Sequence, residues 1–152
     1  MASIMRLINI IARTNTMYRA DKAREENLDI NQALFPYILA LPSLSGISQD
    51  NLARRIYLNK SNVARHLALL EEKGYVERQQ NSEDKRVINV YPTTHIEDIR
   101  PTVRRISREW SKYIVQDLTK EEQELLKALL SKVAARSAEY AERELIGGEN
   151  EE

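Results

Sequence analysis

A run of helix signals between residues 47 and 93 restricts the possible folds of this chain more than any other part of its sequence. Ser48 precedes residues 49–56, and its hydroxyl can accept a hydrogen bond from an amide in the first turn of a helix. Asn59 can cap a second helix in the same way, and Gly74 is suited to end that helix in a left-handed conformation. These signals predict two short helices joined by a tight turn.

A hairpin is predicted directly after the second helix. Residues 76–79 and 86–91 alternate as strands do, and the turn-forming residues 81–84 lie between them. Pro92 ends the second strand. Two helices followed by a hairpin, in this order, are typical of a winged helix-turn-helix that binds DNA.

The first turns of the second helix carry side chains that can contact base edges. Asparagine pairs bidentately with adenine, arginine pairs with guanine, and serine serves either base or phosphate. In helix-turn-helix proteins this end of the second helix enters the major groove. We therefore expect major-groove contacts from Ser61, Asn62, Arg65 and His66.

The stretch from Arg54 to His66 contains basic residues and no acid, which predicts a local positive patch facing the DNA backbone. We expect phosphate contacts from Ser48, Arg54 and Lys60. Taken alone, the same spacing also fits a solvated helix pair with a charged face.

The predicted hairpin has a basic tip formed by Lys85 and Arg86. An arginine there suits the narrow minor groove, where the negative potential is enhanced. Asp84 is close enough to orient the Arg86 guanidinium, so we assign these three residues to the wing contact. The alternative is an ordinary surface hairpin with an ion pair that is worth little.

Long amphipathic helices are predicted on both sides of this region. One runs from the N-terminus to about Glu26, and a shorter one begins at Asp29 with Gln32 completing a capping box. Ser45-Gly46-Ile47 can supply a third strand beside the hairpin. After it, Thr94 with Glu97, and Thr119 with Glu122, are expected to cap two further helices.

The apolar stripes of the long helices exceed what one small core can cover. A helix of about 25 residues reaches roughly 37 Å, beyond the body of so small a domain. The last helix carries an apolar stripe of Leu125, Leu126, Leu129, Leu130, Val133 and Tyr140, with Ser137 among them. We expect a homodimer that places one winged helix on each half of a near-palindromic DNA site.

The motif segments resemble the MarR family of bacterial and archaeal transcriptional regulators over residues 59–65, 70–78 and 84–93. The family wing pattern is D-x-R-x-x-x-V-x-L-T, and the matching residues are Asp84, Arg86, Val90 and Thr93. Pro92 stands where the family usually has leucine. The resemblance implies a DNA-binding transcriptional regulator, more often a repressor than an activator, that dimerises through its N- and C-terminal helices.

The expected fold is mainly α, of the α+β class: a winged helix-turn-helix with a β-hairpin wing, flanked by long N- and C-terminal dimerisation helices. We treat residues 1–152 as a single MarR-like unit. Within it we expect the winged helix-turn-helix in residues 30–93, dimerisation helices in residues 1–27 and 94–146, and an acidic tail in residues 147–152.

The resemblance also implies an effector site. MarR-like proteins commonly bind a small aromatic or phenolic anion between the dimer helices and the winged domain, and Tyr18, Arg19, Tyr37 and Arg55 can contribute rings or cations to such a cleft. Tyr18 and Tyr37 also lie on helical stripes, where a tyrosine is more often a plain core residue.

Composition excludes several other classes of function. The chain has no cysteine, which rules out disulfides and thiolate zinc sites, and its only imidazoles are His66 and His95. We therefore expect no metal and no cofactor. Motifs of phosphate-binding loops, zinc proteases and serine hydrolases are absent, so we expect no enzyme. There is no signal peptide or apolar span of membrane length, and we expect a cytoplasmic protein.

The 23 lysine and arginine residues equal the 23 aspartate and glutamate residues, so the net charge is zero. This counts slightly against DNA binding. A segregated distribution, basic near Arg54–Arg65 and acidic at the C-terminus, still permits one basic face. The competing hypothesis is a winged-helix module that binds proteins and not DNA.

Overall fold

The computed structural model of the chain describes residues 3–43 and 45–147. Its N-terminal half contains helix α1 (Ile4–Glu25), the 3-10 turn η1 (Gln32–Leu34), helix α2 (Phe35–Ala40), strand β1 (Ile47–Ser48) and helix α3 (Gln49–Ile56). Its C-terminal half contains helix α4 (Lys60–Glu72), strands β2 (Val76–Gln80) and β3 (Ile88–Pro92), and helices α5 (Ile96–Tyr113) and α6 (Lys120–Gly147). This mainly helical fold with its small sheet confirms the predicted winged helix.

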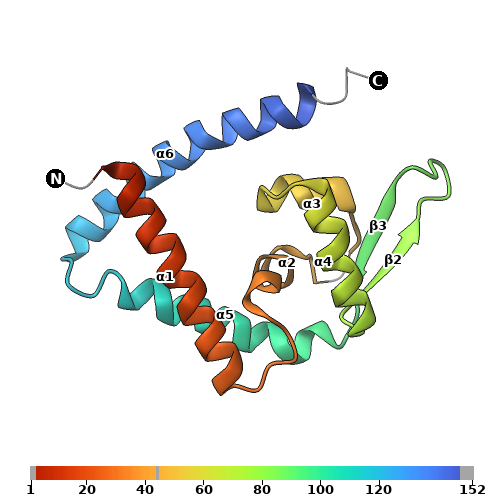
Figure 1. The fold of residues 1–152 in the computed structure, drawn as a ribbon, viewed down its shortest axis with the longest axis horizontal. Helices are drawn as coiled ribbons and strands as arrows, with labels where there is room; N and C mark the ends of the chain where they lie inside the picture. The colour runs from red at the N-terminus through yellow and green to blue at the C-terminus, as the bar shows by residue number, and fades with distance from the viewer. Residues whose placement is uncertain (1–2, 44, 148–152) are drawn as a thin grey trace.

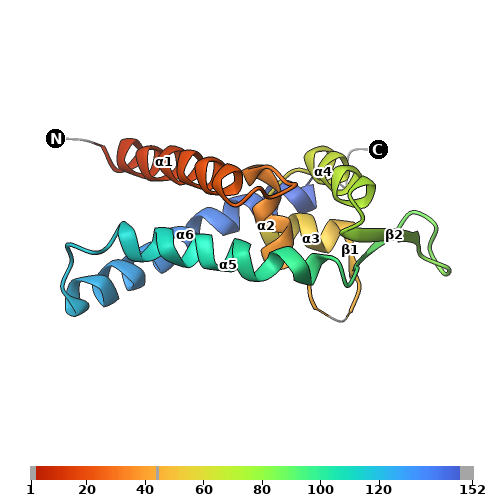
Figure 2. The same cartoon turned by 90° about the horizontal axis from the view of Figure 1, so that it is seen from below.

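Two parts are visible in Figure 1. The elements from η1 to β3 form a compact unit, which we call the head (residues 30–93), and the hairpin of β2 and β3 extends from it beside α3 and α4. Helix α1 and the C-terminal part of α5 extend to the other side, and α6 returns from there toward α3, as Figure 2 also shows. The predicted acidic tail lies, apart from Gly147, outside the described residues.

The helix signals within the head are confirmed by hydrogen bonds. Ser48 Oγ accepts from the Asn51 amide at 3.2 Å, and Asn59 Oδ1 accepts from the Asn62 amide at 2.8 Å. Gly74, which follows the C-cap residue Lys73 of α4, has a φ of 77°, the left-handed conformation that glycine adopts without strain. These caps fix where α3 and α4 begin, and therefore where their first turns point.

The strands form an antiparallel sheet of order β1-β3-β2. Ile47 lies opposite Val90, so the predicted third strand exists but begins at the last residue of the segment proposed for it. Pro92 is the final residue of β3 and lies opposite Val76. The next amide, of Thr93, donates to the Tyr75 carbonyl at 3.0 Å, so the proline does not shorten the hairpin at its base.

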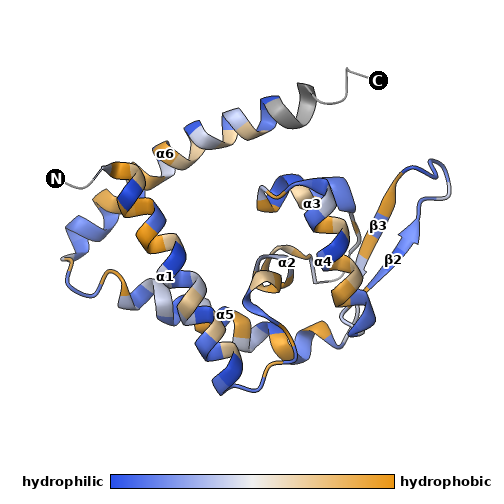
Figure 3. Cartoon of the chain, in the orientation of Figure 1, coloured by the Kyte–Doolittle hydropathy of each residue, from blue (hydrophilic) through white to orange (hydrophobic). Residues whose placement is uncertain are grey.

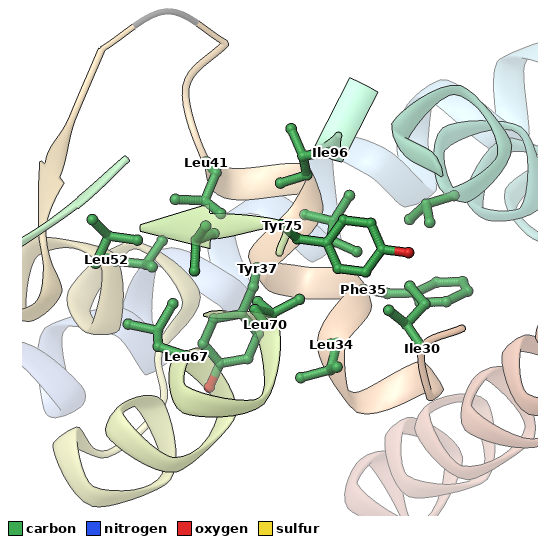
Figure 4. Packing of buried hydrophobic residues seen from close by; sticks show 14 of the residues in the cluster. Ile30, Leu34, Phe35, Tyr37, Leu41, Leu52, Leu67, Leu70, Tyr75 and Ile96 are labelled. Carbon is green, nitrogen blue, oxygen red and sulfur yellow. The ribbon is translucent and has the colours of Figure 1, made fainter. Parts of the chain in front are cut away.

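One hydrophobic core holds the head together and includes residues of α5 (Figure 4). Phe35, Tyr37 and Ile38 of α2 lie at its centre with no exposed surface. Leu67 and Leu70 of α4 are fully buried in the same core. Burying apolar side chains of this size is worth about 1.5–3 kcal/mol each, so the core holds α4 firmly in place.

Two predicted helix caps are wrong, because both carboxylates bind basic side chains. The Asp29 carboxylate binds Lys73 at 2.7 Å, and Asn31 caps η1 in its place by accepting from the Ala33 amide. Glu97 lies 3.2 Å from the Arg100 guanidinium, and α5 begins after His95 without a side-chain cap. The Thr119–Glu122 capping box of α6 is confirmed in both directions.

Helix α1 is attached to α5. Arg105 binds both Glu26 and Glu109, and the Tyr18 and Trp110 rings lie 5.1 Å apart. The opposite surfaces are less covered: Figure 3 shows apolar residues recurring along α1 and α6. The large apolar side chains that remain exposed there are Ile4, Met5, Leu7, Ile10, Ile11, Met17, Leu125, Leu129, Leu130, Val133 and Tyr140.

Within residues 3–43 and 45–147, no helix combines the length and the apolar character that crossing a membrane requires.

Candidate nucleic-acid interface

The start of α4 presents three of the predicted base-contacting residues to solvent. Val63, Leu67 and Leu70 turn the opposite face of the helix into the core. Ser61 and Arg65 are exposed and Asn62 is half-buried. An α4 held by its buried face can therefore offer this end to a groove of DNA.

Hydrogen bonds organise these polar side chains before any ligand binds. Arg65 Nη2 donates to Asn62 Oδ1 at 3.0 Å, and Ser61 Oγ donates to the capping oxygen of Asn59 at 2.9 Å. The Asn62 oxygen thus holds the guanidinium near the helix start. The NH₂ group of the Asn62 side chain can donate a hydrogen bond to an adenine N7.

His66, the fourth predicted base-contacting residue, is placed differently. Its Nδ1 lies 3.0 Å from the hydroxyl of buried Tyr37, and the two rings meet edge to face at 5.4 Å. Burial, together with the positive charge of Arg65, lowers the pKa of His66. Burial raises the pKa of Tyr37 to about 12. One side of the His66 ring is therefore engaged by the core at neutral pH.

The predicted phosphate-contacting residues lie on the helix-turn-helix. Arg54 is exposed on α3, and Lys60 at the start of α4 forms an ion pair with Asp50 at 3.2 Å. The Ser48 hydroxyl serves as the cap of α3. Asp50, in the first turn of the helix that Ser48 caps, adds a negative charge to this surface. The prediction of an all-basic patch missed it because Asp50 precedes residues 54–66 in the sequence.

The wing tip holds Arg86 in a defined geometry. Asp84 Oδ1 accepts from Arg86 Nε, and Oδ2 accepts from Nη2, both at 3.1 Å; Oδ1 also accepts from the Arg86 amide at 3.0 Å. These hydrogen bonds lower the pKa of the Asp84 carboxyl, which keeps it ionised. The Arg86 side chain is 91% exposed, so the predicted orienting pair exists and remains open to a ligand.

The wing and the helix-turn-helix meet at a small crevice. It encloses about 80 Å³ and is lined by Ser48, Gln49, Asp50, Arg86, Val87 and Ile88. The fold therefore brings the capped start of α3 and the guanidinium-bearing wing residue to one place, although 38 positions separate Ser48 and Arg86 in the sequence. Lys85 is exposed at the same tip, where its carbonyl accepts from Gln80 Nε2.

An ion pair that sequence reasoning missed fixes the base of the wing. Glu71 at the end of α4 accepts from the Arg78 amide, Nε and Nη2 at 3.0, 2.9 and 2.7 Å. The hydrogen bonds from Arg78 lower the pKa of Glu71. The opposite charges seven positions apart, across the Gly74 turn, were the available signal. This bond couples the angle of the wing to the axis of α4.

The four residues predicted for an effector cleft have separate neighbours. The Tyr18 hydroxyl donates to Glu109 at 3.5 Å, the Arg19 guanidinium lies 5.7 Å from the Phe35 ring centre, and Arg55 donates to the Ala40 carbonyl at 2.8 Å. Tyr37 has no exposed surface and lies in the core beneath α4, which agrees with the alternative of a plain core residue. The effector role of Tyr18, Arg19 and Arg55 stays a prediction.

Within the described part of the chain, no cluster of three or more histidine, cysteine or acidic residues is arranged to hold a metal ion.

A capped helix with exposed amide and guanidinium groups, next to a hairpin with an oriented arginine, defines a winged-helix protein of the type that binds DNA. Comparison with known proteins agrees with this class. Residues 30–88 match the model of the MarR family. This match over the head confirms the resemblance to the MarR family of transcriptional regulators that the motifs predicted.

Individual relatives extend the match beyond the head. The chain is 26% identical over 133 residues to an uncharacterized HTH-type transcriptional regulator, YybA, of Bacillus subtilis. This alignment covers 88% of this chain and 87% of the relative. The crystal structure of MarR superposes with a TM-score of 0.79 at 26% identity, covering 91% of this chain and 93% of that one.

A MarR family regulator from Listeria monocytogenes, solved in complex with a 26mer DNA, superposes with a TM-score of 0.82 at 24% identity and covers 94% of both chains. The family and the named relatives are transcriptional regulators, which confirms that the chain is not an enzyme.

Proposed function

We propose that this regulator binds a near-palindromic DNA site as a homodimer and acts mainly as a repressor. The observation that carries the proposal is the Asn62–Arg65 pair at the start of α4, together with the Asp84–Arg86 pair of the wing. In each pair, a side-chain oxygen orients a guanidinium that can still donate to a hydrogen-bond acceptor on DNA. The structural match to a regulator solved with DNA supports the same conclusion.

The proposed DNA contacts fall into three groups: base edges of the major groove, phosphates and the minor groove. Ser61, Asn62, Arg65 and His66 would lie at base edges of the major groove. Ser48, Arg54 and Lys60 would contact phosphates, which requires Lys60 to exchange its partner Asp50 for a phosphate oxygen. Arg86, oriented by Asp84 and accompanied by Lys85, would enter the adjacent minor groove.

The homodimer would bury the exposed apolar surfaces of α1 and α6. Ile4 is 72% exposed, Leu125 is 60% exposed, and their helices lie outside the head. Solvation of so many apolar side chains is unfavourable, and a second copy with the same stripes can cover them through a two-fold axis. The long helices, residues 1–27 and 94–146, would form this interface and leave both heads free.

Two finer parts of the proposal concern setting and control. A DNA-binding regulator would act in the cytoplasm, where it meets its operator. A small aromatic or phenolic effector would relieve repression if it bound one spacing of the two heads more tightly than the other. Tyr18, Arg19 and Arg55 are the residues that would contribute to its site.

The direct test removes the exposed cations of the interface. The triple variant Lys60→Ala, Arg65→Ala and Arg86→Ala should lose most of its affinity for DNA fragments selected by the wild-type protein, measured by fluorescence anisotropy at several salt concentrations. Removing each cation that binds a phosphate should also lower the slope of log affinity against log salt by about one unit.

A matched control removes the same charge elsewhere: Arg104→Ala, Arg108→Ala and Lys112→Ala on the exposed face of α5, outside the head and outside the exposed apolar side chains of α1 and α6. This control should bind DNA nearly as the wild type does. Equal affinity of the wild type and the interface variant would contradict the proposal and would favour a protein-binding winged helix.

A further inference from the structure

The Tyr37 hydroxyl is a polar group of the core that faces α4. Tyr37 has no exposed surface, and its ring lies beside Leu67 with the hydroxyl directed toward α4 (Figure 4). The atom it meets is Nδ1 of His66, at 3.0 Å. A buried hydroxyl needs a hydrogen-bond partner, since leaving it unpaired costs the free energy of its lost hydration.

The direction of this hydrogen bond follows from the hydrogens that are available. Tyr37 stays protonated at neutral pH, because burial raises its pKa to about 12. Its hydroxyl hydrogen therefore needs an acceptor, and His66 Nδ1 is the group in the described part of the chain that lies in reach. Nδ1 can accept only if it carries no hydrogen.

The second ring nitrogen of His66 then carries the proton. The lowered pKa of His66 keeps the ring neutral at neutral pH, and a neutral imidazole has one N–H group. With Nδ1 as the acceptor, that group is Nε2–H. Nε2 has no hydrogen-bond partner among the described residues and is not one of their buried unpaired atoms, so it is open to solvent.

The open nitrogen belongs to the surface that faces DNA in the proposed function. His66 follows Asn62 by four positions, which places the two side chains one turn apart on the same side of α4. Arg65, the residue before His66, is hydrogen-bonded to Asn62. His66 is thus the inner member of the same exposed row, with one ring edge in the core and the other outside.

We propose that Tyr37 is a positioning residue that locks His66 in its Nε2–H tautomer, so that α4 offers DNA a fixed hydrogen-bond donor at this position. The inference rests on the proposed function, because it assigns a donor to the same interface. The acceptor is an oxygen or nitrogen of a base edge in the major groove, such as guanine N7 or O6, adenine N7 or thymine O4. A phosphate oxygen has the same acceptor chemistry, and the experiment separates the two sources.

The first measurement is independent of DNA. Two-dimensional ¹⁵N NMR of the histidine rings at neutral pH should show His66 with its proton on Nε2 in the wild type. Tyr37→Phe should give a mixture of tautomers or the Nδ1–H form. The control Tyr75→Phe removes another core tyrosine hydroxyl and should leave the His66 signal unchanged. An Nδ1–H tautomer in the wild type would overturn the proposal, whether or not the protein binds DNA.

The second measurement compares sequence preference. Binding of Tyr37→Phe to single-base variants of the selected DNA should lose about three- to tenfold discrimination at one base pair of each half-site, the range of one neutral hydrogen bond. A uniform loss across all sequences would assign the donor to phosphate. Unchanged discrimination in a folded Tyr37→Phe protein with altered tautomers would contradict the role in recognition.

A rescue variant separates positioning from a structural effect. His66→Gln places an amide NH₂ group near the position of Nε2 and needs no tautomer, so it should keep the preference at that base pair. Adding Tyr37→Phe to His66→Gln should then change discrimination no further. A second loss in the double variant would show that Tyr37 acts through stability alone.

Discussion

At the scale of single residues, the arginines of this chain differ in the partners that hold them. Arg65 and Arg86 are held by short side chains, an amide and a carboxylate, that leave the guanidinium accessible. Arg78 and Arg105 use their donors in bonds between elements of the fold. Holding a guanidinium before DNA arrives reduces the entropy lost on binding, so an acid next to a DNA-contacting arginine can assist it.

Replacing the Asp84 carboxylate of the wing tests whether it orients Arg86, because the two possible effects on DNA affinity have opposite signs. Asp84→Ala removes a negative charge near DNA, which would strengthen binding by simple electrostatics. Because it also removes the bonds that orient Arg86, we expect DNA affinity to fall several-fold in an anisotropy titration. Glu83→Ala, which removes the same charge from the exposed neighbouring residue, should leave affinity unchanged or raise it. Tighter binding by both variants would refute the orienting role.

At the scale of elements, the sequence correctly predicted those helix ends that local hydrogen bonds determine. Ser48 and Asn59 bond to amides three positions away, and α3 and α4 begin where these caps predict. The cap assigned to Asp29 failed because its partner, Lys73, is 44 positions distant. The tyrosine–histidine contact under α4 was missed for the same reason: its two side chains meet only after packing.

The Glu71–Arg78 pair should contribute to stability in a pH-dependent way. Glu71→Gln should lower the free energy of unfolding at neutral pH by about 0.5–1 kcal/mol, since the pair is partly exposed. The hydrogen bonds from Arg78 lower the pKa of Glu71 in the folded protein. Its contribution is therefore present above the ordinary glutamate pKa and is lost as pH falls through the lowered value.

Urea denaturation at several pH values checks this expectation. The difference between wild type and Glu71→Gln should shrink toward zero in acid, whereas the control Glu72→Gln, on the exposed neighbour, should show little difference at any pH. A difference that stays constant with pH would mean that the carboxylate charge is not what stabilises the base of the wing.

At the scale of the whole molecule, neutrality and DNA binding are compatible because the charges are segregated. The net charge is zero, yet the exposed cations of α3, α4 and the wing lie together on the head. The apolar surface is segregated as well, because most of its large exposed side chains lie on α1 and α6. One part of the chain is thus suited to a polyanion and the other to a second copy of the chain.

The proposed dimer would depend on this apolar surface. Leu129→Glu with Val133→Glu places two charges on a stripe whose residues are about half exposed in the single chain. We expect sedimentation analysis to show monomers, and DNA affinity to fall by at least tenfold because the two heads no longer bind together. Ala135→Glu, an exposed position on the opposite side of α6, should remain dimeric. A dimeric double variant would place the interface elsewhere.

Binding to paired half-sites is tested best by sequencing the DNA fragments that the purified protein retains from a random library. We predict one enriched motif made of two inverted half-sites, with centres about 10 base pairs or a multiple of this apart. Enrichment of a single unpaired half-site, or no enrichment over the starting library, would contradict binding by a two-fold symmetric pair of heads.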